Sequence, residues 1–446
     1  MWLASPIILT MFSSTLMWTA DTILLGHYSS LALGAAGLGG LITWATYSLF
    51  NNLSRISNTF IAQAFGRNDN KAVGDYAWQV AYIAIAGGII LSLMGYFSNH
   101  VLPWTQNPPE VIDQTYLYIK WRTLSAVFTQ LAFCLMGYFQ GRKRTRVPMW
   151  AGIVSNSVNV LLDIWLIFGW TGFEFAGRTW LAVPEMGVTG AAIGTSVATF
   201  LNFLIMAAWA IFPAYGRKHY KIHVPRKIDF KIIKKAFVVG MPASMSGFID
   251  MVGFAIFTIL IGRAGAVALA TSQIQVQILS FSFMPMWGLT IAGSVLMGNL
   301  VGKGDHDKAE MYGKQTYKMG LYYSLTLAVI LVLLGGNVYK IFTPDPAILA
   351  FAATMVPLAA LFQVFDGARM IGNGLLTGAG DTKPTMLIAF FVGWLVFLPL
   401  TWYLVVYHNG SVAVAWIGSV VCYAIRSALL YGRFLSGKWR HVDLWK

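Results

Sequence analysis

Charged residues are scarce in this chain of 446 residues. Asp, Glu, Lys and Arg make up 11% of it and hydrophobic residues 57%, whereas a soluble domain carries about 25% charged residues. No long polar tract remains that would form a separate soluble domain. This composition excludes an ordinary soluble protein and favours one that crosses a membrane many times as helices.

Cysteine is nearly absent, and the short signatures of catalysis and nucleotide binding are missing. Cys134 and Cys422 both lie in apolar runs, which argues against a disulfide framework or a cysteine metal site. No Walker-type phosphate loop, HExxH motif or Ser-His-Asp arrangement occurs, so we expect no ATP drive, no cofactor and no enzymatic activity. The stretch GAGDTKP at 378–384 resembles a phosphate loop, but we interpret it as a turn closed by Pro384.

Apolar segments, by contrast, are long and regularly spaced. Twelve of them reach the roughly 20 residues that a helix needs to cross a hydrocarbon core of about 30 Å. They fall at 3–26, 31–62, 76–99, 114–140, 147–170, 185–212, 236–262, 267–300, 314–337, 348–377, 383–407 and 411–434. The sequence therefore predicts an all-α polytopic membrane protein with twelve transmembrane helices and both termini on one side.

The formal net charge of +14 comes from Lys and Arg residues that gather in alternate loops and in the C-terminal tail. The loops on the opposite side hold only Arg178, Arg263 and Lys340. Since loops rich in Lys and Arg stay in the cytoplasm, we expect a protein of the cell membrane with cytoplasmic N- and C-termini. The basic excess then reports topology, and no nucleic-acid partner is expected.

The two halves of the chain resemble each other when Pro6 is aligned with Pro242. Residues 6–69 then match 242–305 without a gap, and TILLGHYSSLAL falls on TILIGRAGAVAL. Six spans are an even number, so both halves keep the same orientation. This arrangement predicts a pseudo-two-fold axis along the membrane normal, as in transporters that work by alternating access.

The repeat sets the predicted domain boundaries. We expect an N-terminal six-helix lobe at 1–212, a basic cytoplasmic linker at 213–235 and a C-terminal six-helix lobe at 236–446. Each chain then contains both lobes, which favours a monomer.

Acidic residues inside the spans of the first half are candidate functional groups, because a charge at the bilayer centre costs about 2.5–3.5 kcal/mol on insertion scales. Asn159 and Asp163 are spaced i, i+4 on one helix face. Asp21, Asp163 and Thr195 all lie roughly 8–12 Å from the outer ends of their spans. Two carboxylates, an amide and a hydroxyl at one depth suit a shared proton or, with both acids ionised, Na⁺.

The second half has acids at other places. Asp366 and Arg369 are spaced i, i+3 and are expected to pair, whereas Asp250 has no local partner. Gln273 and Gln277 share a helix face that we expect to line a cavity.

Three arginines, Arg55, Arg369 and Arg426, lie in the cytoplasmic halves of their spans. We expect their long side chains to extend to the inner interface.

The chain resembles the MATE (multidrug and toxic compound extrusion) family, NorM/DinF-like, of the wider MOP exporter and flippase superfamily. The motifs that carry the resemblance are DTILLGH, QAFGRNDNKA, NSVNVLLD, GVTGAAIGTS, GMPASMSGFID and FDGARMIGNGLLTGAGDTKP. Asp21 matches the span 1 aspartate that such transporters use for cation coupling. The resemblance makes Asn159, Asp163 and Thr195 its companions in an N-lobe cation site.

The resemblance also assigns residues outside that cluster. Asp250 and Asp366 match the acids of spans 7 and 10 in the NorM branch, and Pro6 matches the proline about which span 1 bends. The tyrosines often found one turn before the acids are replaced here by Met17 and Phe362, which leaves H⁺ and Na⁺ open as the coupling ion.

These observations predict a cation-coupled antiporter that exports organic, cationic and amphipathic drugs or toxins by alternating access. The alternative is a flippase for a lipid-linked oligosaccharide or another lipid-like substrate, since such relatives share the fold. Flippases tend to carry cationic residues in the cleft, whereas the candidates here are acidic. A membrane enzyme would need a clustered acid-base or nucleophile set at the interface, which the sequence does not show. A passive channel is disfavoured by the intact repeat with its buried acids.

Overall fold

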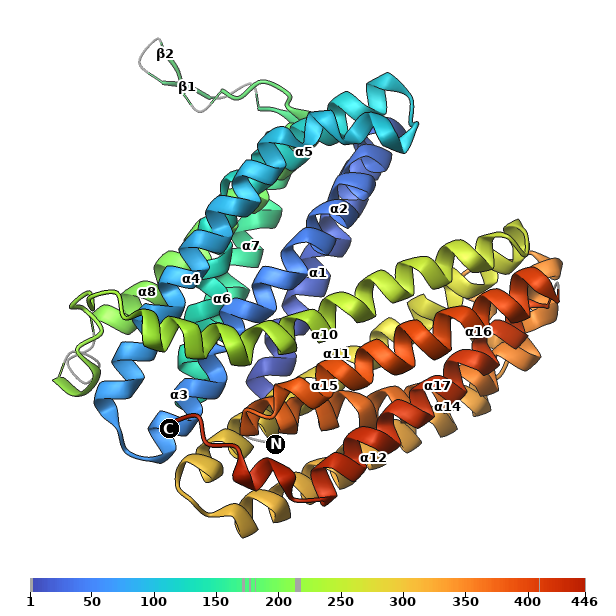
Figure 1. Cartoon of the computed structure of the whole chain (residues 1–446). Helices are drawn as coiled ribbons and strands as arrows, with labels where there is room; N and C mark the ends of the chain where they lie inside the picture. The colour runs from blue at the N-terminus through green and yellow to red at the C-terminus, as the bar shows by residue number, and fades with distance from the viewer. Residues whose placement is uncertain are drawn as a thin grey trace. The chain divides into compact units, whose positions relative to one another are not determined.

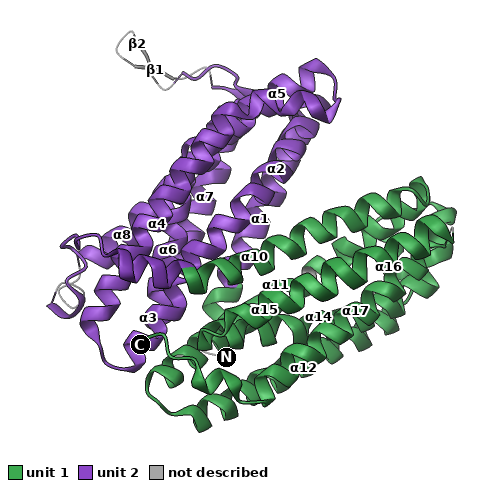
Figure 2. Ribbon diagram, viewed as in Figure 1, with its two compact units in different colours: residues 1–8, 238–446 green, residues 9–237 purple. Residues whose placement is uncertain are grey.

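The computed structural model describes residues 3–170, 173–175, 178–180, 182–212, 218–408 and 410–445. The chain forms two compact units, shown in different colours in Figure 2. The N-terminal unit is Leu9–Phe237, and the C-terminal unit is Val238–Lys446 together with Met1–Ile8. The described part of the expected linker thus groups with the N-terminal unit, while residues 213–217 of that linker lie outside the described residues.

Helices build the N-terminal unit almost completely (Figure 1). They are α1 (Ala4–Tyr28), α2 (Ser30–Arg55), α3 (Ser57–Gly66), α4 (Asn70–Tyr96), α5 (Pro109–Leu124), α6 (Ala126–Gly141), α7 (Arg146–Phe168) and α8 (Gly187–Ile211). Short 3₁₀ turns at Phe97–His100 and Leu102–Thr105 follow α4. Between α7 and α8, the strands β1 (Phe173–Phe175) and β2 (Arg178–Trp180) pair antiparallel as a small hairpin.

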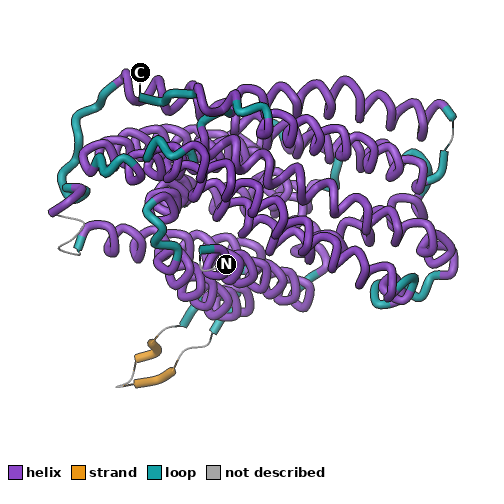
Figure 3. Tube along the Cα trace, turned by 90° about the horizontal axis from the view of Figure 1, so that it is seen from below, coloured by secondary structure: helices purple, strands orange, loops and turns teal. Residues whose placement is uncertain are grey.

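Helices joined by short loops build the described part of the C-terminal unit; Figure 3 draws all helices in purple and all loops in teal. Its helices are α10 (Phe230–Gly262), α11 (Ala266–Gly302), α12 (His306–Leu334), α13 (Asn337–Lys340), α14 (Pro346–Ala379), α15 (Thr382–Phe390), α16 (Leu398–Trp402) and α17 (Val412–Leu435). A π-helical segment at Phe391–Phe397 joins α15 to α16, and a second one at Tyr403–Tyr407 continues α16, so that Thr382–Tyr407 forms one span. A 3₁₀ turn at Lys438–His441 follows α17.

Eleven helices in the described part of the chain are long and apolar enough to cross a membrane. The remaining predicted span, 114–140, is present as α5 and α6, two helices of 16 residues each that meet at Ser125. The twelve predicted spans are therefore all helical; the second is interrupted at Ile56, between α2 and α3, and the fourth at Ser125.

Hydroxyl groups of neighbouring helices donate to backbone carbonyls next to the break between α5 and α6. Ser196 donates to the carbonyl of Trp121 at 2.9 Å, and Ser92 donates to that of Thr123 at 2.8 Å. The carbonyl of Arg122 accepts from the Tyr47 hydroxyl at 3.3 Å. A broken helix is tolerated at membrane depth only when its free backbone groups are paired in this way.

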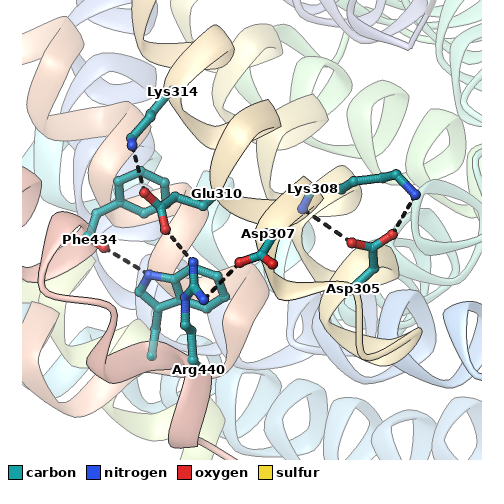
Figure 4. A network of polar contacts seen from close by, with 8 residues as sticks. Asp305, Asp307, Lys308, Glu310, Lys314, Phe434 and Arg440 are labelled. Carbon is teal, nitrogen blue, oxygen red and sulfur yellow. Dashed lines mark hydrogen bonds and ion pairs between the residues drawn. The ribbon is translucent and has the colours of Figure 1, made fainter.

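Polar contacts tie the C-terminal segment to α12 and α17 (Figure 4). Arg440 pairs with Asp307 at 3.0 Å and with Glu310 on α12. Between α11 and α12, the hydrogen bond from Lys308 at 2.8 Å holds the pKa of Asp305 below its ordinary value. The Trp439 indole donates to the carbonyl of Phe434 at 2.8 Å. The C-terminal segment is thereby tied to the start of α12 and the end of α17.

The stretch GAGDTKP contains a turn, as predicted, but Pro384, which was expected to close it, lies inside α15. Gly380 ends α14 in the left-handed conformation with φ of 88°, and α15 begins at Thr382. Asp381 accepts two hydrogen bonds from Arg433, at 2.7 and 3.1 Å. Its carboxylate therefore anchors a turn between spans.

Small residues allow close helix packing inside each unit, as is usual in membrane proteins. A Cβ atom on Gly378 of α14 would lie 2.3 Å from the backbone oxygen of Ser294 on α11, whereas a Cβ on Gly432 of α17 would meet nothing within 4 Å. We expect Gly378→Ala to destabilise the protein by about 1–3 kcal/mol through overpacking. Gly432→Ala is the matched control and is expected to be neutral or slightly stabilising.

Thermal unfolding of the detergent-solubilised protein measures the difference. Equal unfolding temperatures for the two alanine variants would show that α11 and α14 do not pack as closely as this.

Candidate functional site

Two of the predicted residues lie fully buried on α7. Asn159 and Asp163 are both 0% exposed, and the Asn159 amide donates to Asp163 Oδ2 at 3.2 Å. This contact is the one that their i, i+4 spacing predicts. The amide fixes one oxygen of the carboxylate and leaves the other oxygen for a different partner.

Asp21, on α1, supplies the second carboxyl group of this cluster. The carboxyl groups of Asp21 and Asp163 lie within hydrogen-bonding reach of each other. Two carboxyl groups make such a contact stably only when a proton or another cation lies between them, because two carboxylates repel each other. The structure thus brings Asp21 of the first span together with Asn159 and Asp163 of the fifth.

The oxygens of this cluster are short of hydrogen-bond donors. With both acids ionised, three buried oxygens have no donor within the described part of the chain: Asp21 Oδ1, Asn159 Oδ1 and Asp163 Oδ1. A buried polar atom without a partner costs about 1–3 kcal/mol, and more when it is charged. Three such atoms from neighbouring side chains form an oxygen-rich site that suits a proton or Na⁺.

Helix α8 closes the other side of Asp163. A Cβ atom on Gly194 would lie 2.2 Å from Asp163 Oδ1, so only glycine leaves room for the carboxylate in this position. Thr195 follows directly and is 6% exposed, but its hydroxyl donates to the carbonyl of Ala191 at 2.8 Å within its own helix. Thr195 therefore lies beside the cluster. Because its hydroxyl hydrogen is already used, its oxygen can act toward the cluster only as a hydrogen-bond acceptor or a cation ligand.

The sequence interpretation missed one cation near these acids. Arg122, in the last turn of α5 at the break of the fourth span, lies within electrostatic range of Asp21. Its guanidinium donates to the Ser125 hydroxyl at 3.3 Å and lies 5.9 Å from the ring centroid of Tyr47. The available signal was an arginine in the middle of the apolar segment 114–140.

The acids of the C-terminal unit have different surroundings. Arg369 on α14 contacts Asp250 on α10 at 2.8 Å and Asp366 at 2.6 Å. Arg426 on α17 contacts the other oxygen of Asp250 at 2.7 Å. We call these four residues the charge tetrad. It contains two acids and two bases and so balances its own charge.

The tetrad confirms one expectation and corrects another. The i, i+3 pairing of Asp366 with Arg369 is confirmed. The expectation that Arg369 and Arg426 extend to the inner interface is wrong, because their side chains are only 11% and 5% exposed and bind carboxylates inside the unit. An internal carboxylate offsets the loss of hydration of a guanidinium without the long reach to water. Arg55 also packs inside its unit, since its guanidinium lies 4.7 Å from the ring centroid of Phe133.

An aromatic ring packs against both arginines of the charge tetrad. Tyr423 of α17 lies 5.2 Å from the guanidinium of Arg369 and 5.8 Å from that of Arg426, measured to the ring centroid. Phe362, at the place where relatives often carry tyrosine, packs its ring 4.5 Å from that of Tyr423. Another helix therefore supplies a tyrosine next to these charges.

The glutamines of α11 divide between two faces, as their spacing predicts. Gln275 is buried; it donates to the carbonyl of Met355 at 2.9 Å and accepts from the Tyr339 hydroxyl at 2.6 Å. Gln273 and Gln277 are both exposed and share the opposite face. They do not join the charge tetrad through any hydrogen bond in the described part of the chain.

Pro6 lies in the first turn of α1, which begins at Ala4. A proline at this position breaks no helical hydrogen bond, because the first N–H groups of a helix have no internal partner. The chain passes from the C-terminal unit to the N-terminal unit between Ile8 and Leu9, shortly after Pro6. The assignment of Pro6 as a hinge stays a prediction.

Comparison with known proteins identifies relatives over nearly the whole chain. The profile of the MatE family matches residues 6–165 and 242–403. The two stretches begin at Pro6 and Pro242, the same residues that open the alignment of the two halves, which confirms the internal repeat. The chain is 32% identical to the probable multidrug resistance protein NorM of Thermotoga maritima, over 94% of this chain and 88% of the relative.

Two further comparisons agree. The multidrug resistance protein MdtK of Yersinia pseudotuberculosis is 26% identical over 89% of this chain and 85% of its own. The crystal structure of the eukaryotic MATE transporter AtDTX14 superimposes with a TM-score of 0.84 at 19% identity, covering 98% of this chain and 95% of that one. This likeness shows the fold, which has twelve helices in two lobes.

The charge tetrad generates a test of its internal balance. Asp250→Asn leaves one excess positive charge, Arg426→Gln leaves one excess negative charge, and the double variant is neutral again. Removing one member of a buried pair destabilises by about 3–5 kcal/mol. We expect each single variant to lose stability on this scale and the double variant to lose much less than the sum.

Thermal unfolding in detergent gives the coupling energy from this double-mutant cycle. If the two losses simply add, the two residues do not form a pair in the folded protein.

Proposed function

Because this chain belongs to the MatE family, we propose that it is a multidrug efflux antiporter driven by H⁺ or Na⁺. Its relatives NorM and MdtK are named as multidrug resistance proteins. The proposed substrates are organic, cationic and amphipathic drugs or toxins, which the protein exports across the cell membrane by alternating access. It acts as a transporter and not as an enzyme.

One observation carries the ion coupling: the three buried oxygens without donors at Asp21, Asn159 and Asp163. A proton between the two carboxyl groups, or a Na⁺ ion held by all three oxygens, supplies the missing partner. The site is buried in a single unit, so its occupancy changes the charge inside that unit directly. Thr195 is the proposed fourth member, through its lone pairs.

Coupling needs only that the ion and the drug favour opposite states of the transporter. In the proposed cycle, Asp21 and Asp163 take up the ion from outside, which neutralises the cluster and favours release of a cationic drug. Loss of the ion to the cytoplasm restores the negative charge and allows the next drug to bind. The proposed bend of the first span at Pro6 accompanies this change.

We assign the main coupling role to the N-terminal unit. In the C-terminal unit, Asp250 and Asp366 already have guanidinium partners at 2.6–2.8 Å. An incoming cation would have to displace Arg369 or Arg426 before it met a free carboxylate. The tetrad and the exposed pair Gln273 and Gln277 are therefore proposed to contact substrate rather than to bind the coupling ion.

The second candidate function is that of a flippase for a lipid-linked oligosaccharide. The observation that favours it is the presence of buried arginines, Arg369 and Arg426, which would attract an anionic headgroup. Each of them is neutralised by Asp250 or Asp366, so the antiporter fits the charge balance better.

The remaining features follow from the sequence and the fold. The excess of Lys and Arg in alternate loops supports cytoplasmic N- and C-termini. A single chain contains both lobes, which supports function as a monomer without a cofactor beyond the coupling ion. Its partners are then the drug, the ion and the lipid bilayer.

Dye efflux in everted membrane vesicles tests the proposal, with a proton gradient and a Na⁺ gradient imposed separately. We expect one gradient to drive efflux of a cationic dye such as ethidium, and Asp21→Asn to reduce that efflux at least about tenfold because it removes the ionisable partner of Asp163. Asp113→Asn, which changes an exposed carboxylate at the outer part of α5, is the matched control and should transport normally.

Full gradient-driven efflux by Asp21→Asn would disprove the coupling role of this cluster. If neither gradient moves the dye in the unmodified protein, the antiporter itself is wrong, and the flippase becomes the leading function.

A further inference from the structure

The segment between α8 and α10 is attached to the N-terminal unit through its described residues. We call its residues 218–229 the strap. Its carbonyls at Ile222, Arg226 and Lys227 accept hydrogen bonds from side chains of α4 at 2.7–3.0 Å. The strap is therefore a fixed part of this unit and not a free tether between lobes.

The donors on α4 show where the strap lies. They are Trp78, Gln79 and Tyr82, and the carbonyl of Tyr220 also packs against Gly74, where a Cβ atom would clash. From Gly74 to Tyr82 the helix rises about 12 Å. Tryptophan and tyrosine near the end of a spanning helix mark the boundary between hydrocarbon and water. The strap thus packs against the first half of α4, next to this boundary.

The strap and the first turn of α10 expose two kinds of side chain. Lys218, Lys221, Lys227, Lys231 and Lys234 are exposed. Val224, Ile228 and Phe230 lie among them and are 46%, 56% and 78% exposed. Lysines interleaved with exposed apolar residues are typical of segments that bind at a lipid interface.

These lysines have no acidic partners. In the part of the chain that the structure describes, the one ion pair of the strap joins Arg226 to Asp75 at 3.1 Å. Asp229 is used locally, since its carboxylate accepts from the backbone N–H of Lys231 at 2.8 Å. The positive charge of the five lysines is therefore available to an external anion.

The C-terminal segment, which is tied to α12 in a comparable way, differs in this respect. Its Arg440 pairs with Asp307 and Glu310, and Lys314 pairs with Glu310 as well. Attachment of a basic segment to its unit thus does not require unpaired lysines.

We propose that the strap binds anionic phospholipids of the surrounding membrane. The lysines contact the lipid phosphates, and Val224, Ile228 and Phe230 enter the acyl region beside them. Each lysine near an anionic surface contributes about 1 kcal/mol, which is about a fivefold change in affinity. The attachment to α4 presents these groups together at the depth of the headgroups.

Native mass spectrometry of the full-length protein in detergent tests this proposal by titration with phosphatidylglycerol. The variant Lys221→Gln with Lys227→Gln removes two exposed strap charges, and we expect it to bind phosphatidylglycerol about 25-fold more weakly. The matched control, Lys303→Gln with Lys318→Gln, removes two exposed lysines of the C-terminal unit and should bind normally. Both variants should keep the unfolding temperature of the unmodified protein.

Two further titrations separate the contributions. Phosphatidylcholine with the same acyl chains should bind weakly and equally to both lysine variants. The variant Ile228→Ser with Phe230→Ser should weaken the binding of both lipids, because it removes apolar insertion.

The proposal is wrong if the strap variant and the control lose phosphatidylglycerol equally. It is also wrong if inorganic phosphate at millimolar concentration displaces the lipid, since the strap would then bind free phosphate without regard to the membrane.

Discussion

An ionised side chain inside a membrane needs a partner of opposite charge, because the hydrocarbon core holds no water that could solvate the charge. The two units meet this requirement in different ways. In the C-terminal unit, Asp250 and Asp366 are matched by two arginines, so the charge is balanced within the protein. In the N-terminal unit, Asp21 and Asp163 face each other with buried oxygens that lack donors. Arg122 is the one cation found near Asp21 within the described residues, and we propose that a coupling ion supplies the partner that the unpaired oxygens lack.

The two halves thus share their arrangement of spans but differ in the polar and charged residues at aligned positions. When the two halves are aligned from Pro6 and Pro242, Asp21 corresponds to Phe257 and Asp366 corresponds to Gln130. Gln130 is fully buried and joins the amide of Asn51 at 2.8 Å. At aligned positions, the N-terminal lobe therefore has a neutral pair of amides and the C-terminal lobe has the charge tetrad. We therefore infer that the two lobes divide ion coupling and substrate contact between them.

The break in the fourth span lies close to the N-terminal cluster of acids. Hydroxyl groups of Tyr47, Ser92 and Ser196 hold the freed carbonyls, and the same break places Arg122 near Asp21. Irregular backbone at membrane depth is typical of the binding regions of transporters. In the second half, α14 runs without a break from Pro346 to Ala379, so within the described chain the break of this span belongs to the N-terminal unit alone.

The sequence by itself determined the features that depend on local spacing and hydropathy. Apolar length predicted the spans, the alignment of the two halves predicted the repeat, and helical spacing predicted the contacts of Asn159 with Asp163 and of Asp366 with Arg369. Only the tertiary structure decided the contacts between distant segments. Asp250 lies on the first span of the C-terminal lobe and Arg426 on its last, and no periodicity links them. The break at Ser125 was equally hidden, because it depends on hydroxyl groups that three other helices bring to it.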